Sequence, residues 1–174
     1  MKDKINFGFT LIELLVVVAI IGILAAVGVS QFSGFTSAAK INAVKANHSN
    51  AVKFISVEIK KCEISGGFFK LKRSSGNPTL VYSDLSCSSS QTTTNQIVEA
   101  FINHLNNEGF KNPFNDVVAR LGYDKVFFRE GTQEEIGQTV IKVSNNNIIT
   151  LTSVFKNSEG VIQTPIISTI KDER

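Results

Sequence analysis

The sequence has little of what enzymes and metal sites require. It contains only two histidines and two cysteines in 174 residues. His48 and His104 fall in separate predicted helices, with no cysteine close to either in sequence. Glu134 and Glu135 are adjacent, so on a strand they would point to opposite faces and form neither a carboxylate pair nor a metal cage. No glycine-rich phosphate loop is present. We therefore expect no enzymatic activity, no metal and no cofactor.

Charge is missing from a long stretch near the N-terminus. No charged residue lies between Glu13 and Lys40, and every residue from 14 to 29 is apolar or glycine. Together with the four residues before Glu13, this run is long enough to cross a bilayer. The remaining chain is polar and rich in turn residues, so it can bury only a small core. The length predicts one globular domain with an appendage.

Strong net charge is also lacking. The formal charge is +3, which is too small to argue for nucleic acid by itself. One local cluster does place basic residues beside aromatic ones, a combination that can bind single-stranded DNA. Its members are Lys60, Lys61, Lys70, Lys72 and Arg73, near Phe68, Phe69 and Tyr82. Such clusters are usually just solvated, so nucleic acid stays a possible partner without support.

Residues 1–35 allow three interpretations. Lys2 and Lys4 before an apolar run fit a secretory signal peptide, cut near small residues such as Gly28 and Ser30. They fit a plain membrane anchor equally well. Neither of these has a use for Glu13, because an acid at a helix centre costs about 2.5–3.5 kcal/mol in a membrane. Glu13 must therefore be neutralised or meet a cation.

The third interpretation is a prepilin-type leader. Residues 4–16, KINFGFTLIELLV, resemble the class III leader of the type IV pilin family, and the likeness extends to about residue 35. The resemblance implies that a prepilin peptidase cuts on the cytoplasmic side after Gly8, and that the new N-terminal residue, Phe9, is N-methylated. It also implies a subunit held in the inner membrane before assembly.

Cleavage after Gly8 would place Glu13 fifth in the mature chain and create an ammonium group at Phe9. In a filament of parallel, staggered helices, Glu13 of one subunit can approach the Phe9 amine of its neighbour. A buried pair of this kind would set the axial register while contributing little net stability. The alternative is a carboxylate near the membrane edge, favoured by the positive end of its own helix dipole.

Small residues recur every four positions along the same segment, which would let helices approach closely in apolar surroundings. They are Gly22, Ala26, Ser30, Gly34 and Ala38. Small residues are also simply frequent in membrane helices. Many members of the pilin family have a helix-breaking proline where this chain has Ser30. We predict that the helix is locally extended between about Gly22 and Gly34 in the assembled fibre.

Helical periodicity continues beyond the apolar run. One stripe about 100° wide holds Ile41, Val44, His48, Ala51, Val52, Ile55, Ile59 and Cys62. The first helix is therefore predicted from near Phe9 to about Lys61. A lone histidine on such a stripe is expected to be a core residue with satisfied hydrogen bonds. A second helix is predicted from Asn95 to Asn107, with Gly109 just past its end.

Strand patterns fill the last part of the chain. Residues 125–129, 138–143, 148–155 and 161–170 form a predicted β-meander, and residues 62–94 read as a connector rich in loops. Pro165 interrupts the last run, which suits an edge strand. The predicted fold class is α+β, with the long N-terminal helix packed on a small antiparallel head. The pilin resemblance implies the same fold.

The two cysteines both follow the apolar segment. If the head is exported, Cys62 and Cys87 reach an oxidising compartment and are expected to pair. Their spacing fits no common zinc pattern. Closing the loop between them would stabilise the fold by roughly 3–4 kcal/mol, and would pin the connector to the end of the first helix.

Together these features predict a leader (residues 1–8), a membrane or fibre-core half of the helix (9–32) and a head (33–174). The leading interpretation is a type IV pilus subunit that forms a homopolymer through its N-terminal helix, with prepilin peptidase and the pilus assembly machinery as partners. It would move from the inner membrane to an extracellular pilus. One alternative is a pseudopilin of a type II secretion system in a periplasmic pseudopilus. Another is an adhesive or DNA-binding head for which the helix is only an anchor.

Overall fold

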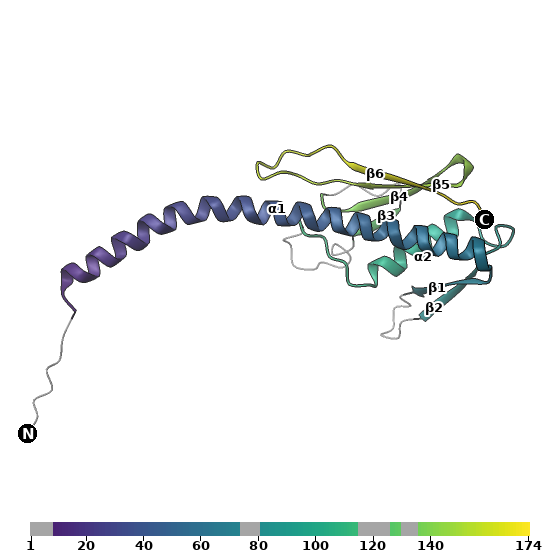
Figure 1. Cartoon of the computed structure of the whole chain (residues 1–174), viewed down its shortest axis with the longest axis horizontal. Helices are drawn as coiled ribbons and strands as arrows, with labels where there is room; N and C mark the ends of the chain where they lie inside the picture. The colour runs from purple at the N-terminus through teal and green to yellow at the C-terminus, as the bar shows by residue number, and fades with distance from the viewer. Residues whose placement is uncertain (1–8, 74–80, 115–125, 130–135) are drawn as a thin grey trace, which may run out of the picture. The chain divides into compact units, whose positions relative to one another are not determined.

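The computed structural model describes residues 9–73, 81–114, 126–129 and 136–174 (Figure 1). The chain divides into two units, Met1–Ser37 and Ala38–Arg174. A single helix, α1 (Leu11–Ser65), begins in the first unit and ends in the second. It starts two residues after the predicted position and ends four residues beyond it.

The second half of α1 buries most of the predicted stripe, and Ile41 and Val52 are half-buried. Val44, Ala51, Ile55 and Ile59 are fully buried, and His48 and Cys62 are nearly so. The lysines outside the stripe, at positions 53, 60 and 61, are exposed. The helix ends because two glycines with positive φ, Gly66 at 61° and Gly67 at 89°, turn the chain away.

The connector contains a β-hairpin that the sequence patterns did not predict. Strands β1 (Phe68–Arg73) and β2 (Val81–Ser86) pair antiparallel, with Phe68 opposite Ser86. The expectation of loops was wrong because β1 carries lysines at alternate positions, and these make its apolar run look short. Phe69 and Leu71 point into the core while Lys70 stays exposed, as the twofold periodicity of a strand requires.

The second helix, α2 (Thr94–Asn106), lies one residue before its predicted position. A capping box fixes its start: the Thr93 hydroxyl accepts from the Gln96 backbone N–H, and the Gln96 side chain accepts from the Thr93 N–H. Gly109 follows the last turn with φ 83°, as expected for a residue that ends a helix.

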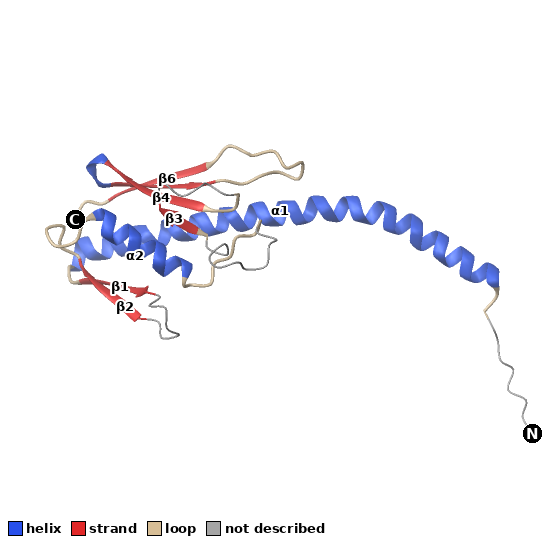
Figure 2. Cartoon of the chain, turned by 180° about the vertical axis from the view of Figure 1, so that it is seen from behind, coloured by secondary structure: helices blue, strands red, loops and turns tan. Residues whose placement is uncertain are grey.

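A four-stranded sheet completes the head, in the order β3-β4-β5-β6 (Figure 2). Its strands are β3 (Phe127–Arg129), β4 (Thr139–Ser144), β5 (Ile148–Ser153) and β6 (Ile166–Lys171). β4, β5 and β6 pair antiparallel, whereas β3 pairs parallel with β4, so the first strand departs from the predicted meander. β6 begins directly after Pro165 and lies at the edge, as predicted.

One core joins these elements. Ile55 and Ile59 of α1 pack with Phe101 of α2 and with apolar residues of both sheets. Phe101 makes edge-on ring contacts with Phe54 and Phe69, at centroid distances of 5.9 and 5.6 Å. The fold is therefore α+β, with the second half of the long helix packed against small sheets.

Candidate assembly site at the start of the helix

Glu13 lies in the first turn of α1, where a capping box with Thr10 holds its carboxylate. Glu13 Oε2 accepts hydrogen bonds from the Thr10 backbone N–H at 2.8 Å and from the Thr10 hydroxyl at 2.7 Å. The Glu13 N–H donates to Thr10 Oγ1 at 3.4 Å. The carboxylate is thus turned back toward the chain start, where it also meets the positive end of the helix dipole.

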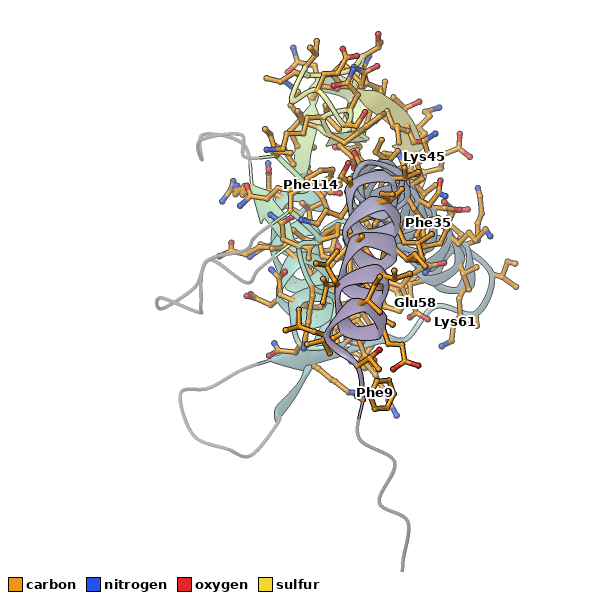
Figure 3. All side chains as sticks on the ribbon, turned by 90° about the vertical axis from the view of Figure 1, so that its left-hand side faces the viewer. Phe9, Phe35, Lys45, Glu58, Lys61 and Phe114 are labelled. Atoms are coloured by element: carbon orange, nitrogen blue, oxygen red, sulfur yellow. A yellow bond between two sulfur atoms is a disulfide. The ribbon has the colours of Figure 1, made fainter. Side chains whose placement is uncertain are left out.

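Thr10 is the site residue that the sequence reasoning missed. The signal was present, since a threonine followed three residues later by a glutamate ahead of an apolar run is the pattern of a capping box. Gly8, the predicted cleavage position, lies outside the described residues. Phe9 is 84% exposed (Figure 3).

The helix that follows presents apolar side chains on every side. From Leu11 to Val27 its large aliphatic residues are between 47% and 82% exposed. Farther along, Phe35 is exposed as well. The helix is long and apolar enough to cross a membrane, with a mean hydropathy of 2.9 in its most apolar window. A surface of this kind needs lipid or other apolar helices around it.

A comparison with known families gives one match. Residues 4–29 match the model of the prokaryotic N-terminal methylation motif. The chain carries a type IV prepilin leader. The matched segment contains Gly8, Phe9 and Glu13, so the prepilin signature coincides with the start of the exposed apolar helix. No curated protein and no solved structure gives a significant match.

The motif matched over residues 4–29 is the signature of type IV prepilin leaders, and it supports a pilin-like or pseudopilin type of precursor. The apolar helix agrees with a precursor that is anchored in a membrane. Among the described residues, no group of three His, Cys, Asp or Glu side chains is placed to hold a metal ion. The pair Glu134 and Glu135 lies outside the described residues.

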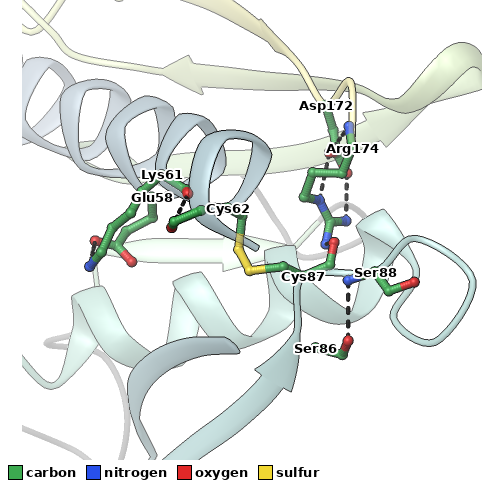
Figure 4. The surroundings of a disulfide bond; sticks show 9 residues. Glu58, Lys61, Cys62, Ser86, Cys87, Ser88, Asp172 and Arg174 are labelled. Atoms are coloured by element: carbon green, nitrogen blue, oxygen red, sulfur yellow. Dashed lines mark hydrogen bonds and ion pairs between the residues drawn. A yellow bond between two sulfur atoms is a disulfide. The ribbon is translucent and has the colours of Figure 1, made fainter. Parts of the chain in front are cut away.

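The far end of the head is closed by a disulfide and a buried ion pair (Figure 4). Cys62, in the last turn of α1, is bonded to Cys87, just after β2, as expected from the sequence. Beside it, Arg174 donates from Nε and Nη2 to the two carboxylate oxygens of Asp172, at 2.7 and 2.8 Å. Arg174 Nη1 also donates to the Cys87 carbonyl at 3.3 Å.

Asp172 in turn ties β6 to α2. Its Oδ2 accepts from the Thr94 hydroxyl at 2.8 Å. Burial raises the pKa of Asp172, but the hydrogen bonds from Arg174 and Thr94 outweigh it, so the pKa lies below its ordinary value. Residues 172–174 therefore hold the last strand by hydrogen bonds and packing, without a second disulfide. We call Asp172 and Arg174 the clasp.

Both histidines are structural. His48 Nδ1 lies 2.7 Å from Ser153 Oγ and its Nε2 lies 2.9 Å from Ser168 Oγ, so it links α1 to β5 and β6. This confirms a core histidine with satisfied hydrogen bonds. His104 Nδ1 accepts from the Lys72 backbone N–H at 2.9 Å and its ring stacks on Phe54 at 4.6 Å. Burial lowers the pKa of both imidazoles.

Three of the five basic residues in the cluster considered for DNA are paired with glutamates in the folded head. Lys60 pairs with Glu63 at 2.7 Å, Lys61 with Glu58 at 3.5 Å and Lys72 with Glu108 at 2.6 Å. Phe69, one of the aromatic residues meant for stacking, is buried in the core. The geometry therefore adds no support for nucleic-acid binding at this cluster.

Proposed function

We propose that residues 9–174 are a structural subunit of a type IV pilus, released from the leader by cleavage after Gly8 and N-methylated at Phe9. Residues 9–32 serve as the membrane span and then as the fibre core, and residues 33–174 form the outer head. The observation that supports this most is a carboxylate at Glu13, held toward the chain start within an otherwise uncharged and exposed apolar helix.

The first step of the argument concerns charge. Glu13 is the only charged side chain among residues 9–39, so within this segment its counter-charge has to come from the new Phe9 amine. In a staggered bundle the amine of a neighbouring subunit is the cation that comes within reach. Because a misaligned neighbour would leave a charge buried without a partner, the pair sets the register between subunits.

The second step concerns the apolar surface. An exposed helix with no polar face is stable in lipid and equally stable among copies of itself, and this is what transfer from a membrane into a fibre requires. At Gly22, Gly28 and Gly34 an added Cβ would meet nothing within 4 Å in the single chain, so these faces are open to close helix–helix approach. Extension of the helix between Gly22 and Gly34 in the fibre stays a prediction.

N-terminal mass spectrometry of sheared surface filaments, combined with Glu13→Ala, tests the proposal. We expect a mature chain that starts at methylated Phe9, and we expect the variant to accumulate in the membrane without forming filaments. Glu99→Ala, which removes an exposed carboxylate from α2, is the matched control and should assemble normally. Filaments of normal abundance from Glu13→Ala, or a retained leader in finished fibres, would contradict the proposal.

The same experiment separates the pilus from the secretion pseudopilus. Both share the leader and the helix, so location decides between them. Abundant subunit in the sheared surface fraction supports a pilus. Confinement to the periplasm together with a secretion defect on deletion would assign the chain to the pseudopilins instead. Loss of adhesion, motility or DNA uptake in the deletion strain would then identify the role of the fibre.

A further inference from the structure

Four lysines gather at the end of the head where α1 enters it. Lys40 and Lys45 lie on α1, Lys111 follows α2 and Lys156 follows β5. Lys40 Nζ and Lys156 Nζ lie 5.9 and 6.0 Å from the ring centroid of Phe114, and Lys45 Nζ lies 5.8 Å from that of Phe155. The Lys111 carbonyl accepts a hydrogen bond from the Asn47 side chain at 3.2 Å. We call these four lysines the basic pole (Lys45 and Phe114 are labelled in Figure 3).

Three lysines of the basic pole, Lys45, Lys111 and Lys156, differ in charge balance from those at the opposite end of the head. No carboxylate of the described residues forms an ion pair with Lys45, Lys111 or Lys156. At the opposite end, Lys60 and Lys171 each have a glutamate within 3.0 Å. The sequence of α1 contributes to this difference, because it contains no acidic residue between Glu13 and Glu58.

An apolar hairpin tip lies next to the basic pole. Residues 154–165 connect β5 to β6 and are held by a backbone bridge between Lys156 and Ile162. At the turn, Asn157 Oδ1 accepts from the N–H groups of Glu159 and Val161. The ordered tip nevertheless leaves Val161 55% exposed and Ile162 62% exposed. These two adjacent side chains give the tip a small apolar surface next to the lysines.

The place of the basic pole in the sequence indicates its partner. Lys40 is the first charged residue after the apolar run, and it follows the exposed Phe35 by about 8 Å of helix rise. Lys45 and Lys111 are exposed, and Lys40 and Lys156 are half-buried. Lysines that lie beside aromatic rings and keep their ammonium groups accessible are suited to the boundary between hydrocarbon and water. A group of lysines at that depth is attracted to negatively charged lipid headgroups.

We propose that the basic pole and the Val161–Ile162 tip form a docking surface for anionic phospholipid headgroups of the bilayer that holds α1. The lysines bind the phosphates, and the two aliphatic side chains enter the headgroup layer. Docking fixes the orientation of the head before assembly. This inference rests on the membrane-anchored stage of the proposed function and not on pilus formation.

The test uses the full chain in lipid nanodiscs. Both native cysteines are in the disulfide, so Ile162→Cys can carry a single nitroxide label. Oxygen concentrates in lipid, whereas a water-soluble nickel chelate stays in water. The ratio of their collision rates with the nitroxide therefore reports whether the tip lies in lipid. We expect contact with lipid in discs of phosphatidylcholine with phosphatidylglycerol, and exposure to water in phosphatidylcholine alone.

Two triple variants that remove the same charge give the matched control. Lys45→Gln/Lys111→Gln/Lys156→Gln should lower the ratio of docked to undocked heads by about a hundredfold, because each lysine near an anionic surface contributes about 1 kcal/mol. Lys60→Gln/Lys61→Gln/Lys70→Gln should leave that ratio unchanged.

Three results would overturn the inference: a tip equally exposed to water in both lipids, equal effects of the two triple variants, or a label that becomes buried only in filaments. The last would make this surface a contact between copies. Because the discs contain no filaments, none of these results depends on whether the chain forms a pilus.

Discussion

The two halves of α1 share one backbone conformation but differ in what can stabilise them. Residues 11–37 expose their aliphatic side chains and carry one charge, at Glu13. Residues 38–65 bury a stripe on the head, in which Val44, Ala51, Ile55 and Ile59 reach 0% exposure. The second half is therefore stabilised by its own chain, whereas the first depends on lipid or on other subunits. Four predictions examine this difference.

The largest effect is expected from the disulfide, which closes a loop of the head alone. Replacing both cysteines, as Cys62→Ser/Cys87→Ser, should lower the free energy of unfolding of the head by about 3–4 kcal/mol. Urea titration in detergent with pulse proteolysis measures this. Reduction of the native protein should reproduce the loss, while insertion of α1 into membranes stays normal. A loss below about 1 kcal/mol would mean that packing alone holds the hairpin.

A pair of identical substitutions compares the two halves directly. Ile55→Ala removes a side chain with 0% exposure and should destabilise the head by about 3 kcal/mol. Ile20→Ala changes a residue that is 52% exposed and should alter head unfolding by less than about 0.5 kcal/mol. The same urea titration measures both variants. Equal losses would show that the halves unfold as one unit.

The clasp allows a comparison within the head. The side chains of Arg174 and Asp172 are 2% and 3% exposed, so Arg174→Ala leaves a buried carboxylate without its partner. We expect a loss of about 2 kcal/mol. Lys171→Ala breaks a pair with Glu173 whose side chains are 63% and 50% exposed, and should cost less than about 1 kcal/mol. Thermal unfolding of both variants should show this order; the reverse order would argue against the clasp.

The smallest effect concerns pH. Burial lowers the pKa of His104; Glu108 and Glu58 oppose the shift, and Lys72 reinforces it. On acidification, His104 is therefore protonated near pH 6.5 in the unfolded chain but only at a lower pH in the folded head. The free energy of unfolding is highest above pH 6.5 and decreases as the pH falls below it. The slope contributed by each histidine stays below about 1.4 kcal/mol per pH unit. His48 contributes in the same direction.

His104→Asn isolates this contribution, because an amide oxygen can still accept from the Lys72 N–H but does not titrate. The variant should lose less stability than the native protein between pH 6.5 and 5, as measured by urea titration at each pH. An unchanged slope, or stability that increases on acidification, would refute the assignment.

Local patterns predicted most of the helical structure. Helical periodicity predicted the stripe on α1 from Val44 to Cys62 and the position of α2. Pro165, which has no backbone N–H to donate, predicted that the strand after it lies at the edge of the sheet. The prepilin leader followed from a contiguous motif. All of these depend on residues that are close in sequence.

Features that depend on distant partners were not predictable in the same way. The clasp joins Asp172 to Thr94 across 78 positions and Arg174 to Cys87 across 87, and no local pattern indicates such contacts. The parallel pairing of β3 with β4 could not be predicted either. Alternation of side chains along a strand shows which residues share a face, but it does not show the direction in which the strand pairs with its neighbour.

The capping box has a consequence for the energetics of polymer growth. Both hydrogen bonds from Thr10 go to one oxygen of the Glu13 carboxylate, Oε2, so a neighbour's amine can bind the other oxygen without displacing them. If the chain assembles as proposed, each added subunit meets a carboxylate that Thr10 already orients, and the resulting ion pair contributes little net stability. The charge would then select the correct alignment, while the force for elongation would have to come from elsewhere.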